Sequence, residues 1–447
     1  MRLTPLRRPA ARHWLPVALA AFTLAGLPAV ASAQSLLELY DAARAFDGTY
    51  LAAKATAQSA EYRAAQADAL ARPSAAMTAN VGVNRTDPPR ITADTSQSAS
   101  ATLSGRYPIF NRANGLTIDQ ARKALISAQA DLDTAEQDLV VRVAQSYFDV
   151  LAAQDALATT RASKAATAEQ LASAKRNFEV GTATITDTRE AQARFDLGTA
   201  QELFAENDLR SKSIALETLV GRSGASPKPL VVPVVLPSPT PANPEDWVSA
   251  ADQQHPIVRR ARIALDVAQL ETGKARAAEL PTVDAVASLG GSDLRGSKYS
   301  VNGNTNTANI GVQLNWPLYT GGATQNRIKE TLALEDKARN ELEAARRGVG
   351  QGARVAYFGV QSGLAQVKAL EAAESSTKLA LEATQLGYKV GVRVNLDVLN
   401  AQSQLFSTQR DLAKARYDVL MGGLRLRQAS GQLTASEVEA VNRLLAK

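Results

Sequence analysis

The sequence repeats itself at a nearly constant interval, and this limits the fold more than any other feature. The pair Tyr147-Phe148 returns 210 residues later as Tyr357-Phe358. The same interval relates further pairs of positions: Val180-Gly181 and Val390-Gly391, Asp187 and Asp397, Ala191-Gln192 and Ala401-Gln402, Gly221 and Gly431. Self-similarity over this length predicts two copies of one structural unit. We place them at residues 34–222 and 246–432.

The residues before the first copy have the pattern of a secretory signal. Residues 1–33 carry four arginines, then an apolar stretch, then Ala31-Ser32-Ala33, so we expect cleavage before Gln34. The alternative is a membrane-anchoring helix, which two prolines within the apolar run disfavour. Cleavage would lower the formal net charge from +6 to +6 − 4 = +2. So weak a charge gives no support to a nucleic-acid partner.

Proline marks the boundary between the copies. Residues 223–245 contain seven prolines, whereas residues 109–226 and 318–447 contain none. Proline fixes φ and removes a hydrogen-bond donor, so 223–245 is predicted to be an extended linker. Residues 433–447 are left as a C-terminal segment after the second copy.

The proline-free tracts predict very long helices. Residues 113–177 and 323–387 are rich in good helix formers and span 65 residues each, or roughly 98 Å at ~1.5 Å per residue. Such a length is typical of coiled-coil packing rather than of a compact domain. Ser35 and Glu38 have the spacing of a capping box at the first helix start. The expected helices cover residues 36–72, 113–177, 188–221, 246–280, 323–387 and 398–431.

Short segments between these helices alternate apolar and polar residues. Four strands are therefore expected, at residues 75–84, 98–109, 283–290 and 308–318. Strands of about 9–11 residues with one apolar face are what a membrane barrel needs, although a half-buried soluble sheet alternates in the same way. The polar segments 86–97 and 290–307 would form loops at one end.

Four strands cannot close a barrel. An open sheet edge inside lipid leaves backbone groups unpaired, at a cost of several kcal/mol each. Two chains would give about 8 strands and a filled interior, whereas three would give about 12 strands and a lumen wide enough to conduct. If the sheet lies in a membrane, the barrel is expected to be shared by three copies of the chain.

Taken together, these motifs give the sequence a resemblance to the TolC family of outer-membrane channels. It is carried by the Tyr-Phe pairs, by the turns Val180 to Asp187 and Val390 to Asp397, and by the segments Tyr107-Pro108-Ile109-Phe110 and Trp316 to Gly322. The resemblance implies a mostly α-helical homotrimer of tandem repeats. It further implies a 12-stranded β-barrel in outer-membrane lipid, continued by a periplasmic α-helical coiled-coil barrel. A periplasmic adaptor (membrane fusion protein) and an inner-membrane pump or ABC exporter would dock to it, for drug efflux or type I secretion.

The two turns differ in their polar residues. The second carries Tyr388 and Arg393 where the first carries phenylalanine and alanine. We predict that these two side chains donate hydrogen bonds to Thr186 and Asp187 of a neighbouring hairpin. Charge-assisted bonds of this kind are worth about 1.5–3 kcal/mol, and the resemblance implies that they hold the tunnel closed. The alternative is that Arg393 is a solvated turn residue.

Two further features of the turns have predicted roles. Three copies of Asp397 would form a carboxylate ring that favours cations. The resembled family has a second aspartate ring three residues later, where this sequence has Asn400, so cation selectivity should be weaker. Gly181 and Gly391 are expected at positive φ in tight turns, and the resemblance implies that these tips contact the adaptor.

Composition argues against catalysis. The chain has no Cys and two His, which leaves little for a metal cluster or a catalytic triad. We find no nucleotide-binding glycine loop, so no catalytic residue, metal or cofactor is predicted. A periplasmic coiled-coil adaptor or scaffold without a pore is the alternative function. Small molecules and polypeptides remain equally open as cargo, whereas three Met and no Cys give no sign of a soft-metal relay.

Overall fold

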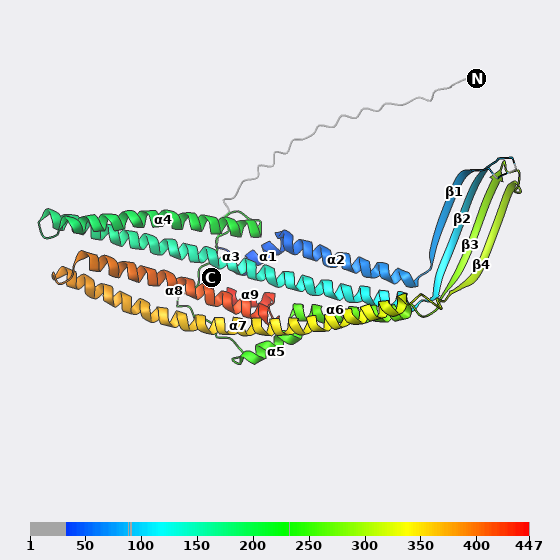
Figure 1. The fold of residues 1–447 in the computed structure, drawn as a ribbon. Helices are drawn as coiled ribbons and strands as arrows, with labels where there is room; N and C mark the ends of the chain where they lie inside the picture. The colour runs from blue at the N-terminus through cyan, green and yellow to red at the C-terminus, as the bar shows by residue number, and fades with distance from the viewer. Residues whose placement is uncertain (1–32, 88, 90–91, 232, 447) are drawn as a thin grey trace, which may run out of the picture. The chain divides into compact units, whose positions relative to one another are not determined.

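The computed structural model describes residues 33–446 apart from 88, 90–91 and 232. The predicted signal peptide therefore lies outside the described residues, except for Ala33. In chain order the elements are α1 (Leu36–Phe46), α2 (Gly48–Asp68), η1 (Ala69–Ala71), β1 (Ser74–Thr86), β2 (Asp94–Phe110), α3 (Arg112–Glu179), α4 (Ile185–Val220), α5 (Pro244–Gln254), α6 (Pro256–Ala277), β3 (Thr282–Arg295), β4 (Gly303–Asn315), α7 (Ala323–Lys389), α8 (Asn395–Ala429) and α9 (Ala435–Asn442) (Figure 1).

Each repeat consists of two short helices, two strands, one long helix and a returning helix. The predicted single helices 36–72 and 246–280 are wrong, because each is broken into two. Asp47 and His255 end one helix in extended backbone and begin the next, with side chains that accept the N–H of Tyr50 and Ile257. At the second break, Pro256 also disfavours helical geometry in the residue before it.

The four strands form one antiparallel sheet in the order β1-β2-β3-β4. The pairing of β2 with β3 joins the two repeats. Strands β1, β2 and β3 are longer than predicted, whereas β4 begins at Gly303 and not at residue 308, and ends at Asn315 and not at residue 318. Pro317 lacks the N–H that a ladder needs, which accounts for the early end. The loops at the far end are correspondingly shorter, at residues 87–93 and 296–302.

One face of the sheet is apolar and uncovered in the single chain. Val81 is 88% exposed and Ile310 is 92% exposed. Exposed aromatic residues follow at the end of the sheet that joins the long helices: Tyr107, Phe110, Trp316 and Tyr319. An outward apolar band with an aromatic girdle is the pattern of a lipid-facing β-surface.

The long helices lie side by side in a layer. Helices α3 and α7 have 68 and 67 residues, or roughly 100 Å each at 1.5 Å per residue. Along this layer the order is α4, α3, α8, α7, because α3 packs on both α4 and α8 while α7 packs on α8 (Figure 1). Within the described part of the chain, no helix is both long and apolar enough to cross a membrane.

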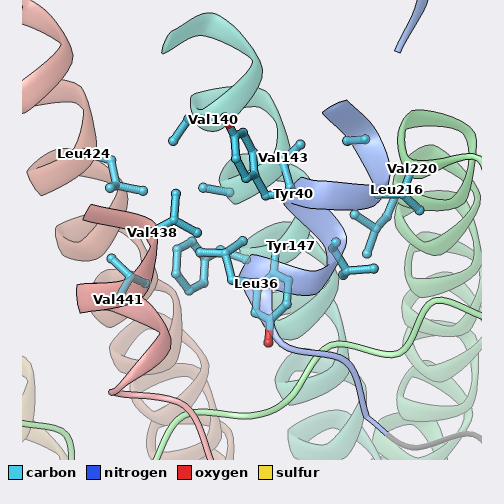
Figure 2. Packing of buried hydrophobic residues seen from close by; sticks show 14 of the residues in the cluster. Leu36, Tyr40, Val140, Val143, Tyr147, Leu216, Val220, Leu424, Val438 and Val441 are labelled. Atoms are coloured by element: carbon cyan, nitrogen blue, oxygen red, sulfur yellow. The ribbon is translucent and has the colours of Figure 1, made fainter. Parts of the chain in front are cut away.

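The largest apolar core surrounds Tyr147, midway along α3. Figure 2 shows Tyr147 among Leu36, Tyr40, Val143 and Leu216, from α1, α3 and α4. The Tyr147 hydroxyl also holds the linker, since it accepts the N–H of Lys228 at 2.8 Å. The repeat-equivalent Tyr357 donates to the carbonyl of Ala242 near the other end of the linker. The two Tyr-Phe motifs thus fix both ends of the linker to the long helices.

Candidate functional site

The turns that join the long helices have the same backbone in both repeats. Gly181 has φ 77° and Gly391 has φ 78°, so the predicted positive φ is present at both. A Cβ at either glycine would meet nothing within 4 Å, so backbone conformation alone requires glycine there. The next residues, Thr182 and Val392, donate their N–H groups to Asn177 and Gly387 at 2.8 and 2.9 Å. These bonds close the helix ends.

The local structure explains why both repeats have an aspartate at the same position, Asp187 in the first and Asp397 in the second. Asp187 Oδ2 accepts the backbone N–H of Thr184 at 2.9 Å and its hydroxyl at 2.7 Å, while Thr184 Oγ1 accepts the N–H of Asp187 at 3.2 Å. Asp397 lies at the same place in α8 and accepts the N–H of Val394 at 3.5 Å. Both carboxylates lie in the first turn of a helix, where the dipole favours negative charge. We did not predict this capping role, although the Thr-x-x-Asp spacing signals it.

The structure places the four predicted gate residues at or beside the two turns but does not join them within one chain. The hydroxyl of Tyr388 accepts the side-chain N–H of Asn177 at 3.2 Å. The guanidinium of Arg393 is 61% exposed and lies 3.7 Å from Asp397. Thr186 is exposed. Among the hydrogen bonds of residues 33–446, neither donor reaches Thr186 or Asp187, and the predicted contacts with another hairpin remain a prediction.

Polar contacts join the first hairpin to the second close to the turns. The Asn395 side chain is buried, donates to the Asp187 carbonyl at 3.3 Å and accepts from Gln170. Further along, Arg194 donates to Asn400 Oδ1 at 2.9 Å. Asn400, at the position of the second ring in the resembled family, therefore has the guanidinium of Arg194 beside it. Sequence reasoning missed both Asn395 and Arg194, since nothing in a repeat register shows which hairpins lie side by side.

Two buried side chains in the core have pKa values that their surroundings shift. Burial, together with a hydrogen bond to Asp155 at 2.6 Å, raises the pKa of Tyr417. Hydrogen bonds from Arg142 lower the pKa of Asp47. Both are structural pairs that hold helices together. Within the described ranges, no group of three or more His, Asp or Glu is placed to hold a metal ion.

Comparison with known proteins agrees with this geometry. The family model described as "Outer membrane efflux protein" matches residues 39–222 and 247–432. The outer membrane protein TolC of Vibrio cholerae is 34% identical over 413 residues, which is 92% of this chain and 93% of the relative. The alkaline protease secretion protein AprF of Pseudomonas aeruginosa is 34% identical over 344 residues, which is 76% of this chain and 71% of AprF.

Solved structures show the same fold. The outer membrane protein VceC of Vibrio cholerae superposes with a TM-score of 0.75 at 20% identity, covering 89% of this chain and 96% of VceC. CusC superposes with a TM-score of 0.77 at 18% identity, covering 89% and 92%. The tandem repeat, the four-stranded sheet and the paired long helices are thus a known arrangement. The chain belongs to the outer membrane efflux protein family, and it is an outer-membrane channel protein rather than an enzyme.

Proposed function

We propose that three copies of the chain form one outer-membrane channel with a periplasmic tunnel. The uncovered apolar face of the sheet, with free edges at β1 and β4, carries this proposal. An open edge in lipid costs several kcal/mol for each unpaired backbone group, and closure of twelve strands into one barrel removes all edges. The channel gives cargo a passive exit from the periplasm.

The relatives support the proposed partners. TolC of Vibrio cholerae is named as an outer membrane protein, and AprF as an alkaline protease secretion protein. We propose that a periplasmic adaptor and an inner-membrane pump or ABC exporter deliver cargo to this channel, for drug efflux, type I protein secretion or both. The exposed tips at Gly181 and Gly391 are the proposed adaptor contacts.

A planar-bilayer recording tests the proposal. The purified mature protein should insert as a stable oligomer and give discrete conductance steps. A periplasmic scaffold would instead stay in the soluble fraction and leave the bilayer silent. That second outcome would contradict the channel proposal.

The proposed gate joins Tyr388 and Arg393 of one hairpin to Thr186 and Asp187 of another copy. Both donors are at the tip, and Arg393 is largely free to reach a second partner because its contact with Asp397 is long. Tyr388→Phe combined with Arg393→Ser should raise single-channel conductance several-fold. Lys389→Ser removes an exposed cation next to Tyr388 and serves as the matched control. Unchanged conductance in the double variant would place the closure elsewhere.

The proposed cation-selective ring consists of Asp397 alone. Arg194 beside Asn400 supplies positive charge where a second carboxylate ring would lie. Asp397→Ala should therefore shift the reversal potential in a salt gradient toward zero. The control is Asp411→Ala, because Asp411 is exposed and lies nearer the C-terminal end of α8 than Asp397 does. An identical reversal potential in the Asp397 variant would refute the ring.

A further inference from the structure

The polar face of the sheet, opposite to the face that carries Ile310, presents a single exposed charge. It consists of every second residue of each strand, and most of these are Ser, Thr, Asn or Gly. Its charged members within the four strands are Asp94, Arg106 and Asp284. The two aspartates are buried, whereas the Arg106 side chain is 61% exposed. Each chain therefore presents one guanidinium group on a surface that is otherwise uncharged.

Arg106 of β2 and Asp284 of β3 form a pair whose two members differ in exposure. Nη2 of Arg106 donates to Oδ2 of Asp284 at 2.5 Å. The other carboxylate oxygen, Oδ1, is buried and has no hydrogen-bond partner among the described residues. The Asp284 carboxylate therefore depends on Arg106, and of the two charges the positive one faces solvent.

A hollow of about 420 Å³ lies against the sheet beside this pair. Besides Arg106, its lining includes a hydroxyl or amide side chain from each of the four strands: Ser74, Ser104, Ser288 and Asn309. Arginine binds carboxylates and phosphates through two parallel hydrogen bonds, and neighbouring hydroxyl and amide groups can donate further ones. This set of donors suits an anionic oxygen group.

We infer that Arg106 forms a binding site for carboxylate- or phosphate-bearing anions inside the barrel. The inference rests on the proposed trimeric channel, in which the polar face lines the lumen. Twelve strands about 4.8 Å apart and tilted by about 40° give a radius of roughly 12 Å. This radius is close to the Debye length of ~10 Å at 0.1 M salt. The three guanidinium groups therefore act together on an anion that passes between them.

The anion site is far from the proposed Asp397 ring and has the opposite charge. Strand β2 ends at Phe110, and α3 begins at Arg112 and runs for 68 residues to the first turn. Asp397 follows the equivalent turn of the second repeat. The length of one long helix, roughly 100 Å, therefore separates the two sites. The two ends of one pathway thus hold ions of opposite sign.

Block of single channels by tripolyphosphate, a polyvalent anion, tests the site in a planar bilayer at about 0.1 M salt. Asp284→Asn removes the partner charge and leaves a solvated guanidinium, so the half-blocking concentration should fall several-fold. Arg106→Gln combined with Asp284→Asn removes both charges without leaving a buried carboxylate unpaired, and should raise that concentration several-fold. Arg106→Lys keeps the charge and should retain the block.

The matched control is a charge pair on the opposite face of the same sheet. Arg85 follows Val83 on the apolar face of β1 and lies 3.1 Å from Asp87. Arg85→Gln combined with Asp87→Asn therefore makes the same change of charge outside the lumen, and should leave the half-blocking concentration unchanged. Loss of the block in this control would assign it to the charge of the barrel as a whole and overturn the site.

The remaining outcomes separate the anion site from the channel itself. If tripolyphosphate does not block the conducting protein, or blocks it equally in all variants, the anion site is wrong and the channel proposal stands. If the unsubstituted protein gives no conductance at all, the channel proposal fails, and the anion site fails with it.

Discussion

At the residue scale, Asp47 shows how one carboxylate fixes several elements. It ends α1, accepts the N–H of Tyr50 at 2.9 Å to begin α2, and receives two hydrogen bonds from Arg142 of α3 at 3.2 and 2.6 Å. The side chain is nearly buried. Loss of its charge would therefore leave the guanidinium of Arg142 without its main partner.

This pair should make the stability of the protein depend on pH. The hydrogen bonds from Arg142 lower the pKa of Asp47 in the fold. A carboxyl group whose pKa is lowered in the fold stabilises the fold at pH values above its pKa in the unfolded chain, about 3.9. This stabilisation is lost as the pH falls through the pKa of the folded state. We expect Asp47→Asn to cost about 1–3 kcal/mol at pH 7, and much less near pH 3. Chemical denaturation at both pH values measures it.

An exposed ion pair offers the control for this prediction. Lys414 and Asp418 lie 2.6 Å apart with most of both side chains in solvent. Such pairs contribute about 0–1 kcal/mol, so Asp418→Asn should leave the midpoint nearly unchanged at either pH. A pH-independent cost of Asp47→Asn would contradict the charge argument and leave only the cap.

The two tyrosines that hold the linker should differ in their contribution. Tyr147→Phe removes a buried hydroxyl that accepts the Lys228 N–H at 2.8 Å and can donate to the Gln34 or Lys228 carbonyl, at about 1–3 kcal/mol. Tyr357→Phe leaves only the Ala242 carbonyl, which has a second lone pair for other donors. We expect a larger loss of thermal stability at 147 than at 357, and none for the exposed Tyr62→Phe. Equal losses at both sites would contradict this.

Side-chain hydrogen bonds could be predicted from the sequence only where both partners are close in the chain. The capping box of Ser35 and Glu38 is present because its spacing alone specifies it. Asp47 and His255 are 255 − 47 = 208 residues apart, close to the repeat interval, yet the helix breaks at these two residues were missed. Nothing local distinguishes a capping aspartate from a solvated one until Arg142 of α3 is known to lie beside it.

At the scale of elements, the break between the two short helices of each repeat contacts the glycine that follows the returning helix. Gly221 follows α4 and lies against Phe46, whereas Gly431 follows α8 and lies against His255. Both have positive φ, at 68° and 73°. The breaks and the helix ends therefore form matching contacts in the two repeats, a feature that repeat spacing alone could not reveal.

Alanine substitutions separate the two reasons for glycine. Gly391 has open space around a Cβ, so Gly391→Ala should cost only the left-handed backbone penalty of about 1–2 kcal/mol. At Gly431 a Cβ would also lie 2.6 Å from the Cα of His255, so Gly431→Ala should cost clearly more. Thermal unfolding of the two variants compares them. Equal costs would mean that the α5–α6 break moves aside freely.

At the scale of the whole molecule, the two faces of the sheet should differ in their tolerance for a charged side chain. Ile310 is on the apolar face and Asn309, next to it, is on the polar face of β4. Arginine on a lipid-facing β-surface costs about 2–4 kcal/mol at mid-membrane. Ile310→Arg should therefore reduce the amount of protein recovered in outer membranes, whereas Asn309→Arg should leave it unchanged. Equal recovery of both would argue against lipid contact on this face.

The architecture was largely predictable because it depends on long periodic patterns. The long helices and the four strands were expected near their observed positions, whereas the strand ends next to the loops, the C-terminal end of β4 and the two helix breaks were wrong. The turns were also located correctly as structure. The contacts between hairpins could not be predicted, since Arg194 with Asn400 and Asn177 with Tyr388 join segments more than 200 residues apart.

The linker also brings the two ends of the described chain to one place. Gln34 donates its N–H to Ser226 at 2.7 Å, and Ala446 donates to Pro229 at 2.8 Å. A short peptide that joined residue 446 to residue 34 would therefore give a circular polypeptide without distorting the fold. Opening that circle within the loop 296–302 would give a circular permutant with its two repeats read in a new order. Its assembly would show that spatial neighbourhood, and not reading order, specifies this architecture.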